Sequence, residues 1–105
     1  MKLTNVRTFP GARPDKPQAL KVLEEASETV EAFKQYDRAC TDVIHPSEAA
    51  PFMRAGFKDA LMDEIADTIQ SSCNLAAALG VTDLTPYLAR CEERNRERGR
   101  YEQVH

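Results

Sequence analysis

The chain has 105 residues, of which 42% are hydrophobic and 30% are charged, with 17 Asp and Glu against 14 Lys and Arg. This balance predicts one small globular domain and excludes a disordered tail, and the formal charge of -3 argues against a nucleic-acid coat, which needs a basic face. No apolar run approaches the roughly 20 residues of a membrane span, and the N-terminus lacks the apolar core of a signal peptide.

The chain is expected to begin with an extended and mobile arm over residues 1–14, which contain proline and glycine but no periodic apolar pattern. A helix is predicted to follow over about 16–37. Asp15 and Gln18 have the spacing of a capping box, in which a side chain bonds to free N–H groups of the first turn. Apolar residues then recur at steps of three and four, in one stripe on the helix: Leu20, Leu23, Ala26, Val30 and Phe33.

Residues 38–57 are predicted to be a connection, because proline and glycine recur in them. This stretch is longer than a tight hairpin needs. Two interpretations stay open for it: a lid or base-selecting loop, with Phe52, Met53 and Phe57 as its apolar residues, or an ordinary surface loop.

Two more helices are predicted in the second half of the chain. One runs over about 57–79, with Gly80 as its C-cap and an apolar stripe of Phe57, Leu61, Ile65, Ile69, Cys73 and Leu79. The other begins after the capping residue Asp83 and is expected to turn Leu84, Tyr87, Leu88 and Cys91 inward. No segment alternates with the period of two that half-buried strands show.

These patterns predict an all-α fold, in which residues 15–105 form a single helical domain of two long antiparallel helices and a shorter third. A helix of about 22 residues presents an apolar strip roughly 33 Å long. Because one short helix cannot cover two such strips, we expect further copies of the chain to complete the bundle, as a homodimer or homotetramer.

The three cysteines, Cys40, Cys73 and Cys91, are odd in number and have no CxxC spacing. This usage does not indicate a disulfide framework or a zinc site. It predicts buried, reduced thiols in a cytoplasmic protein.

Acidic residues are concentrated on the two long predicted helices. Glu25 and Glu28 are three residues apart, and Glu64 and Asp67 repeat that spacing, so each pair projects from one helix face. In an antiparallel hairpin the four carboxylates can converge, which is favourable only around a cation. Oxygen ligands without His or Cys suit Mg²⁺ or Mn²⁺. The alternative is a solvated acidic face, the commoner origin of such runs.

Short motifs accompany these acids on all three predicted helices. They are Lys21-x-x-Glu24-Glu25-Ala26-Ser27-Glu28, Asp63-Glu64-Ile65-Ala66-Asp67 and Arg94-Asn95-x-x-Arg98-Gly99-x-Tyr101. Together they resemble the paired ExxE and ExxD motifs and the closing Lys-Asn-x-x-Arg-Gly element of the MazG-type all-α nucleoside triphosphate pyrophosphohydrolases. The resemblance covers about residues 16–101, in the family's order, with Arg94 where the family commonly has Lys.

The resemblance implies hydrolysis of the bond between the α and β phosphates of a nucleoside triphosphate, which yields a nucleoside monophosphate and pyrophosphate. It also implies a Mg²⁺ cofactor, with Mn²⁺ as a substitute. The acidic charge and the lack of a long apolar run already argue against a nucleic-acid polymer or a membrane as partner. The metal ligands would be Glu25, Glu28, Glu64 and Asp67; Glu24 and Glu25 would act on the attacking water; and Lys21, Arg94, Asn95 and Arg98 would bind the substrate.

Other interpretations stay open. Lys21 also has the spacing of a simple ion pair with Glu25, and the basic residues near the C-terminus would suit a solvated helix end. Phosphoribosyl-ATP pyrophosphohydrolase, in the same superfamily, usually has an aromatic-His pair after the second acidic motif, where this chain has Thr68-Ile69-Gln70. Outside the superfamily, a non-enzymatic helical interaction module would use the acidic face to dock a basic partner.

Overall fold

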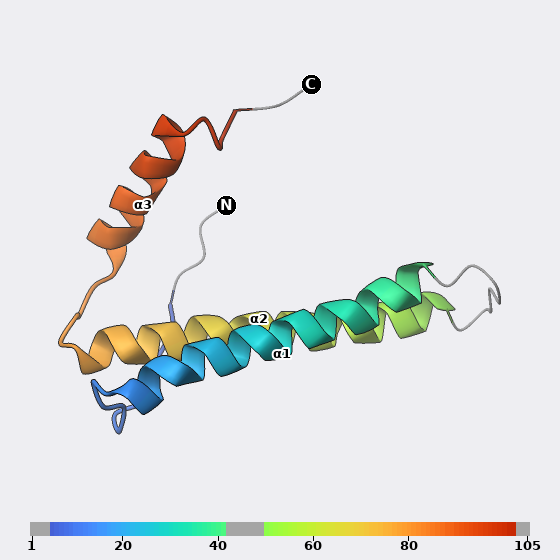
Figure 1. Ribbon diagram of the computed structural model, residues 1–105, viewed down its shortest axis with the longest axis horizontal. Helices are drawn as coiled ribbons and strands as arrows, with labels where there is room; N and C mark the ends of the chain where they lie inside the picture. The colour runs from blue at the N-terminus through green and yellow to red at the C-terminus, as the bar shows by residue number, and fades with distance from the viewer. Residues whose placement is uncertain (1–4, 42–49, 103–105) are drawn as a thin grey trace.

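The computed structural model describes residues 5–41 and 50–102 and contains three helices: α1 (Lys16–Thr41), α2 (Ala50–Ala78) and α3 (Thr85–Glu97). α1 and α2 run side by side in opposite directions as a long hairpin, and α3 projects from one end of it (Figure 1). The described residues contain no strand, which confirms the all-α prediction of two long antiparallel helices and a shorter third. None of these helices is both long and apolar enough to cross a membrane.

The hairpin is longer than the sequence patterns predict. α1 continues to Thr41 and α2 already begins at Ala50, so the prediction of a connection over 38–57 is wrong for all of its described residues. Pro51 lies in the first turn of α2, where its missing N–H has no helical acceptor, and Gly56 lowers helix propensity without ending the helix. Residues 42–49 lie outside the described part of the chain.

The apolar residues assigned to that connection belong to α2 instead. Phe52 and Met53 are exposed on its first turns, and Phe57 is half-buried. At 1.5 Å per residue, Phe52 lies about 18 Å along the helix from Glu64. These residues are therefore neither a loop nor neighbours of the predicted metal ligands.

Asp15 and Gly80 act at helix ends as predicted, whereas the N-cap of α3 is Leu84 and not the predicted Asp83. The Asp15 carboxylate accepts a hydrogen bond of 3.0 Å from the backbone N–H three residues later and caps α1. The Asp83 carboxylate accepts one of 2.9 Å from the Thr85 N–H, and hydrogen bonding to Thr85 lowers the pKa of Asp83. Gly80, with a φ of 87°, ends α2 in a conformation that disfavours side chains.

Small, polar and half-buried apolar side chains join α1 to α2. Leu61 is the one buried apolar residue of the described chain. The half-buried residues of α1 recur at steps of one to four and mark its contact face: Gln18, Val22, Glu25, Ala26, Thr29, Ala32, Tyr36 and Ala39. Because so few large apolar side chains are fully removed from water, the hairpin by itself has only a small hydrophobic core.

A pair of threonine hydroxyls bridges the hairpin. Thr29 Oγ1 and Thr68 Oγ1 lie 3.1 Å apart. Each hydroxyl also lies 3.0 Å from the carbonyl oxygen four residues earlier in its own helix, at Glu25 and Glu64. Because a hydroxyl has one proton, one threonine donates across the hairpin while the other donates within its own helix.

The apolar stripe predicted on α1 faces away from α2. Leu23, Val30 and Phe33 are 64%, 53% and 51% exposed, and Ala26 alone of the stripe lies on the contact face. The described chain therefore leaves this stripe uncovered, because the contact face lies next to the stripe on the helix and is the one turned toward α2.

The hairpin consequently has two different sides. Residues are 100° apart around a helix, so Leu23 and Val30 lie about 140–160° from Glu28 on α1. The exposed Met62 and Ile69 are displaced by the same angles from Asp67 on α2. We call the side of Glu28 and Asp67 the acidic side, and the opposite one, with Leu23, Val30, Met62 and Ile69, the apolar side.

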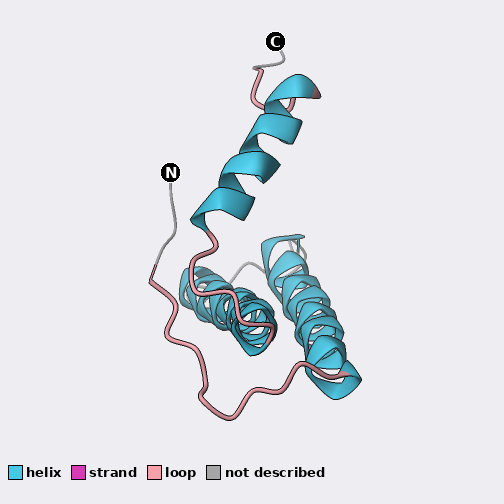
Figure 2. Cartoon of the chain, turned by 90° about the vertical axis from the view of Figure 1, so that its left-hand side faces the viewer, coloured by secondary structure: helices cyan, strands magenta, loops and turns pink. Residues whose placement is uncertain are grey.

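α3 packs against neither α1 nor α2 and rises away from the hairpin (Figure 2). Tyr87 and Leu88 are exposed on it, so the prediction that they turn toward an interior is wrong for the single chain. Cys91 of α3 and Cys40 of α1 are exposed as well, whereas Cys73 is half-buried, and all three are free thiols. The expectation of buried thiols is therefore wrong for two of the three.

The N-terminal arm lies across α2. The Phe9 N–H donates to Asn74 Oδ1 at 3.0 Å, and Gln70 Nε2 donates to the Arg7 carbonyl at 2.8 Å. Residues 5–14 contain no helix, in agreement with the predicted extended arm, and residues 1–4 lie outside the described part. The two bonds hold this segment against the acidic side of the hairpin. The mobility of the arm stays a prediction.

Replacing Thr29 by Val keeps the side-chain shape but removes the hydroxyl, so we expect a loss of about 1 kcal/mol in the free energy of unfolding. Thr68→Val should have a similar effect, and the double variant should lose less than the sum, because the two hydroxyls bond to each other. Urea unfolding followed by circular dichroism measures these differences. Thr41→Val, whose hydroxyl donates to the Asp37 carbonyl of α1 at 2.9 Å, is the matched control. Strict additivity would contradict the contact.

Candidate metal centre

Carboxylates from α1 and α2 meet near the middle of the hairpin. Glu25, Glu28 and Glu64 each offer an oxygen within 4.8 Å of those of the other two. Asp67, the fourth predicted ligand, stands outside this group, but its charge contributes to raising the pKa of Glu25 and of Glu64. The structure thus gathers three of the four predicted ligands and keeps the fourth beside them.

The threonine bridge positions these carboxylates. Thr29 lies one turn from Glu25, and Thr68 lies one turn from Glu64, with the hydroxyl of each close to the carbonyl of its glutamate. The separation of the two helices is therefore set directly next to the two glutamates. Glu28 joins them because residues three apart share a helix face.

Two carboxylate oxygens in this group have no hydrogen-bond partner. Glu25 Oε2 and Glu64 Oε2 are buried, and no donor in the described residues reaches either of them. Buried acceptors normally have a partner, because leaving one without a donor is unfavourable. A cation between the helices would satisfy both oxygens at once.

Burial and the crowding of like charges raise the pKa values of Glu25 and Glu64. Burial is the largest cause of the raised pKa of Glu25, followed by the carboxyl of Glu28 and the charges of Asp67 and Glu64. Burial and the Glu28 carboxyl raise the pKa of Glu64 as well. A cation supplies the opposite charge, so its binding would release protons from these groups.

The donor set consists of carboxylate oxygens alone. Oxygen ligands suit the hard cations Mg²⁺ and Mn²⁺, whereas zinc sites normally include His or Cys. Mg²⁺ is usually held by a few carboxylates and keeps waters or substrate phosphates in its remaining positions. Glu25, Glu28 and Glu64 fit that pattern, and Asp67 stands outside the group but contributes its charge.

Lys21 and Glu24 lie on the rim of the cluster. They form an ion pair of 3.3 Å between Lys21 Nζ and Glu24 Oε2, and both side chains are mostly exposed. The structure shows this pair where the sequence suggested one between Lys21 and Glu25. Exposed pairs of this kind contribute little stability, so Lys21 can exchange Glu24 for an anionic ligand. Glu24 lies outside the group of converging oxygens.

The phosphate-binding residues predicted on α3 are not part of this site in the single chain. Arg94, Asn95 and Arg98 lie on or just after α3, which contacts neither long helix. Asn95 instead accepts two hydrogen bonds of 3.0 Å from Arg100, at its carbonyl and at Oδ1. Gly99, with a φ of 71°, permits the turn that makes these bonds, so this motif ends α3.

A hollow of about 510 Å³ lies between the arm, α1 and α2, next to the carboxylates. Lys21, Glu25 and Asp67 line one part of it, and the arm and α2 contribute Phe9, Gln70, Ser71 and Asn74. No role was predicted for these last four residues. Gln70 and Asn74 follow Asp67 at helical spacing, so the sequence already places their amides on the helix face of that acid.

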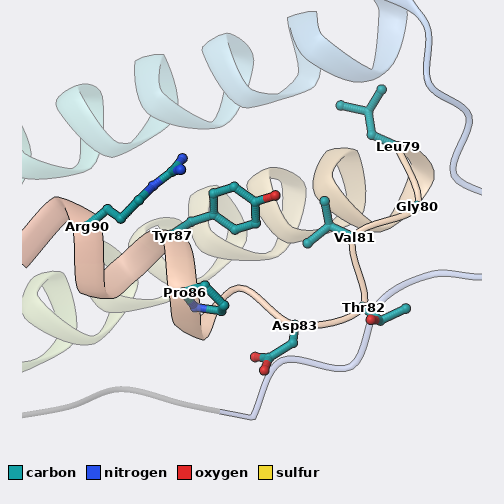
Figure 3. A pocket seen from close by; sticks show the side chains of 8 residues that line it. All are labelled: Leu79, Gly80, Val81, Thr82, Asp83, Pro86, Tyr87 and Arg90. Carbon is teal, nitrogen blue, oxygen red and sulfur yellow. The ribbon is translucent and has the colours of Figure 1, made fainter.

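A second hollow, of about 550 Å³, lies where α2 leads into α3 (Figure 3). The Arg90 guanidinium lies 4.9 Å from the centre of the Tyr87 ring, a cation–π contact within α3. Asp83 is the one acid in the lining, and its carboxylate already accepts the Thr85 N–H. This hollow therefore offers no group of metal ligands.

Protein-family models, curated proteins and solved structures show no match to this chain. The resemblance to MazG-type enzymes accordingly stays a prediction based on three short motifs. Support for a function has to come from the cluster of Glu25, Glu28 and Glu64 and from what surrounds it.

Replacing Glu64 by Gln should stabilise the metal-free protein at pH 7 and abolish its stabilisation by Mg²⁺. The raised pKa of Glu64 means that the folded state binds the proton more tightly than the unfolded state. Stability is therefore lost as pH rises from the ordinary glutamate pKa through the folded one, and Gln removes that loss. Thermal unfolding with EDTA or with Mg²⁺ measures both effects.

Glu31→Gln is the control for this experiment, because Glu31 pairs with Lys34 on the surface of α1 and lies outside the cluster. It should alter neither the metal-free stability nor the response to Mg²⁺ by a comparable amount. The gain from Glu64→Gln should shrink below about pH 5, where glutamates become protonated. A gain that grows toward acid pH would contradict the direction of the pKa shift.

Proposed function

We propose that this chain is a Mg²⁺-dependent nucleoside triphosphate pyrophosphohydrolase of the MazG type. The observation that carries the proposal is the convergence of Glu25, Glu28 and Glu64 from two helices, with two buried oxygens that lack partners. A group of like charges without internal compensation favours a ligand that brings positive charge. The same three residues belong to the ExxE and ExxD motifs from which the sequence suggested this activity.

An acidic site binds a polyphosphate only through cations that reverse its local charge. When bound, Mg²⁺ supplies the charge that polarises the α-phosphorus and stabilises the leaving pyrophosphate. Glu25, Glu28 and Glu64 would hold the metal, with Asp67 adding a ligand. A water oxygen then bonds to the α-phosphorus, the bridging bond to the β-phosphate breaks, and Glu24 at the rim accepts the proton of the water.

Lys21 is suited to bind the substrate phosphates, because it lines the same hollow as Glu25 and Asp67. Its ion pair with Glu24 links the two rim residues, so phosphate binding would release Glu24 to act on water. Three free thiols, two of them exposed, are compatible with the cytoplasm, which we propose as the setting of this activity.

We further propose that the chain associates with itself. It exposes 8768 Å² of surface, whereas a compact monomer of 11.8 kDa exposes about 5,900 Å². The excess is as large as the area that one chain contributes to an obligate dimer. A second copy of the chain can cover the apolar side, because its own apolar side carries the same exposed residues: Leu23, Val30, Met62 and Ile69.

Association through the apolar side would leave the acidic side open to substrate. It would also give α3 a partner, since α3 contacts neither helix of its own hairpin. Arg94, Asn95 and Arg98 could then reach the phosphates at a neighbouring chain's site, a position that they do not have in the single chain. Whether two or four copies assemble is the part of this proposal that solution mass decides.

The purified chain with Mg²⁺ is expected to release pyrophosphate, and no orthophosphate, from members of a panel of canonical, deoxy and damaged nucleoside triphosphates. EDTA should abolish the release, and Glu28→Gln should lower kcat/KM by about 100-fold or more, as expected for a metal ligand. Glu31→Gln is the control that should retain activity. Activity that persists in Glu28→Gln combined with Asp67→Asn would contradict the proposed site.

Analytical ultracentrifugation should give a mass of at least two chains for the unmodified protein. The double substitution Val30→Lys and Ile69→Lys places charges on the apolar side and should shift the mass toward one chain. Gln35→Lys adds a charge at an exposed position on the other side of α1 and should leave the mass unchanged. A monomer in the unmodified protein would rule out self-association.

A further inference from the structure

The hollow beside the carboxylates is built from polar groups whose orientation is fixed by the backbone. The Phe9 N–H can only donate, so the Asn74 atom that it meets at 3.0 Å must be the carbonyl oxygen Oδ1. The Arg7 carbonyl can only accept, so the Gln70 atom at 2.8 Å from it must be the amide nitrogen Nε2. Both amides are therefore oriented by main-chain groups of the arm.

These bonds leave one donor and one acceptor without a partner in the described residues. Gln70 Nε2 uses its second proton to donate to Asn74 Oδ1 at 2.9 Å. This leaves the Asn74 NH₂ group as a donor and Gln70 Oε1 as an acceptor. Asn74 is 3% exposed, so its side chain is held rigidly while lining the hollow. This donor and this acceptor are therefore available to bond to a ligand that enters the hollow.

An aromatic residue is among those that line the same hollow. Phe9 donates its backbone N–H to Asn74, lines the hollow and stays 61% exposed. An exposed aromatic residue at such a hollow is suited to stack on a flat ligand. Lys21, Glu25 and Asp67 line the same hollow, so such a ligand would lie next to the carboxylate cluster.

We propose that this hollow binds the base of the nucleoside triphosphate, with Phe9 stacking on its face and the Asn74 and Gln70 amides bonding to its edge. This inference rests on the proposed function, because the cluster must hold the phosphates. A nucleobase combines the three properties that the hollow requires: a flat π face, an acceptor for the Asn74 amide and a donor for Gln70 Oε1. The N-terminal arm is then a specificity element, since it supplies the stacking ring and orients both amides.

The test compares binding of four non-hydrolysable α,β-methylene nucleoside triphosphates with binding of inorganic tripolyphosphate, by calorimetry in Mg²⁺. We expect the unmodified chain to bind at least one nucleotide analogue about tenfold or more tightly than tripolyphosphate. Phe9→Ala should remove that difference and leave tripolyphosphate binding unchanged, whereas Phe9→Trp should keep it. Val6→Ala, in the same arm but outside the lining, is the matched control.

The substitution Asn74→Asp tests whether Asn74 contacts the base or only holds the N-terminal arm in place. It keeps an oxygen for the Phe9 N–H but replaces the donor amide by an acceptor, so the order of affinities among the four bases should change. Equal changes for all bases and for tripolyphosphate would show a structural or charge effect and would overturn the inference.

The two proposals fail in different ways. If nucleotide analogues and tripolyphosphate bind equally and Phe9→Ala changes nothing, the base site is overturned while the phosphate site stands. If neither ligand binds in Mg²⁺, the proposed function is overturned, and the base site falls with it.

Discussion

The hydroxyl contact between Thr29 and Thr68 sets the spacing on which the rest of the hairpin depends. In the described residues it is the one side-chain hydrogen bond between α1 and α2, and Leu61 is the one buried apolar side chain. Each hydroxyl also lies close to a carbonyl at Glu25 or Glu64, which ties the contact to the backbone that carries the carboxylates. The packing of α1 against α2 and the positions of the carboxylates therefore depend on each other.

Both sides of the hairpin carry groups that are unfavourable in the single chain. On the acidic side, buried oxygens of Glu25 and Glu64 without partners destabilise the metal-free chain, and a bound cation would reverse that effect. On the apolar side, Leu23 and Val30 are exposed to water. The proposed metal site and the proposed association face both consist of groups that the single hairpin leaves unsatisfied.

Predictions of helix ends were confirmed where the signal acts within one turn of the helix. Asp15 and Gly80 end their helices as predicted, because a cap acts within one turn of the residue that provides it. The prediction for residues 38–57 was wrong because Pro51 breaks a helix only in its interior, and it lies in the first turn of α2. The periodicity of α1 correctly indicated an apolar face, but periodicity does not identify what covers that face.

The candidate metal site also combines features that residue spacing predicts with features that only the tertiary contacts set. The sequence by itself determined that Glu25 and Glu28 share one helix face, because a spacing of three has that result in any helix. Only the tertiary structure decided that Glu64 closes on them while Asp67 stands aside. It also brought Phe9 against Asn74, two residues 65 positions apart. Such contacts depend on how α2 and the arm lie against α1, and no spacing along the chain encodes that arrangement.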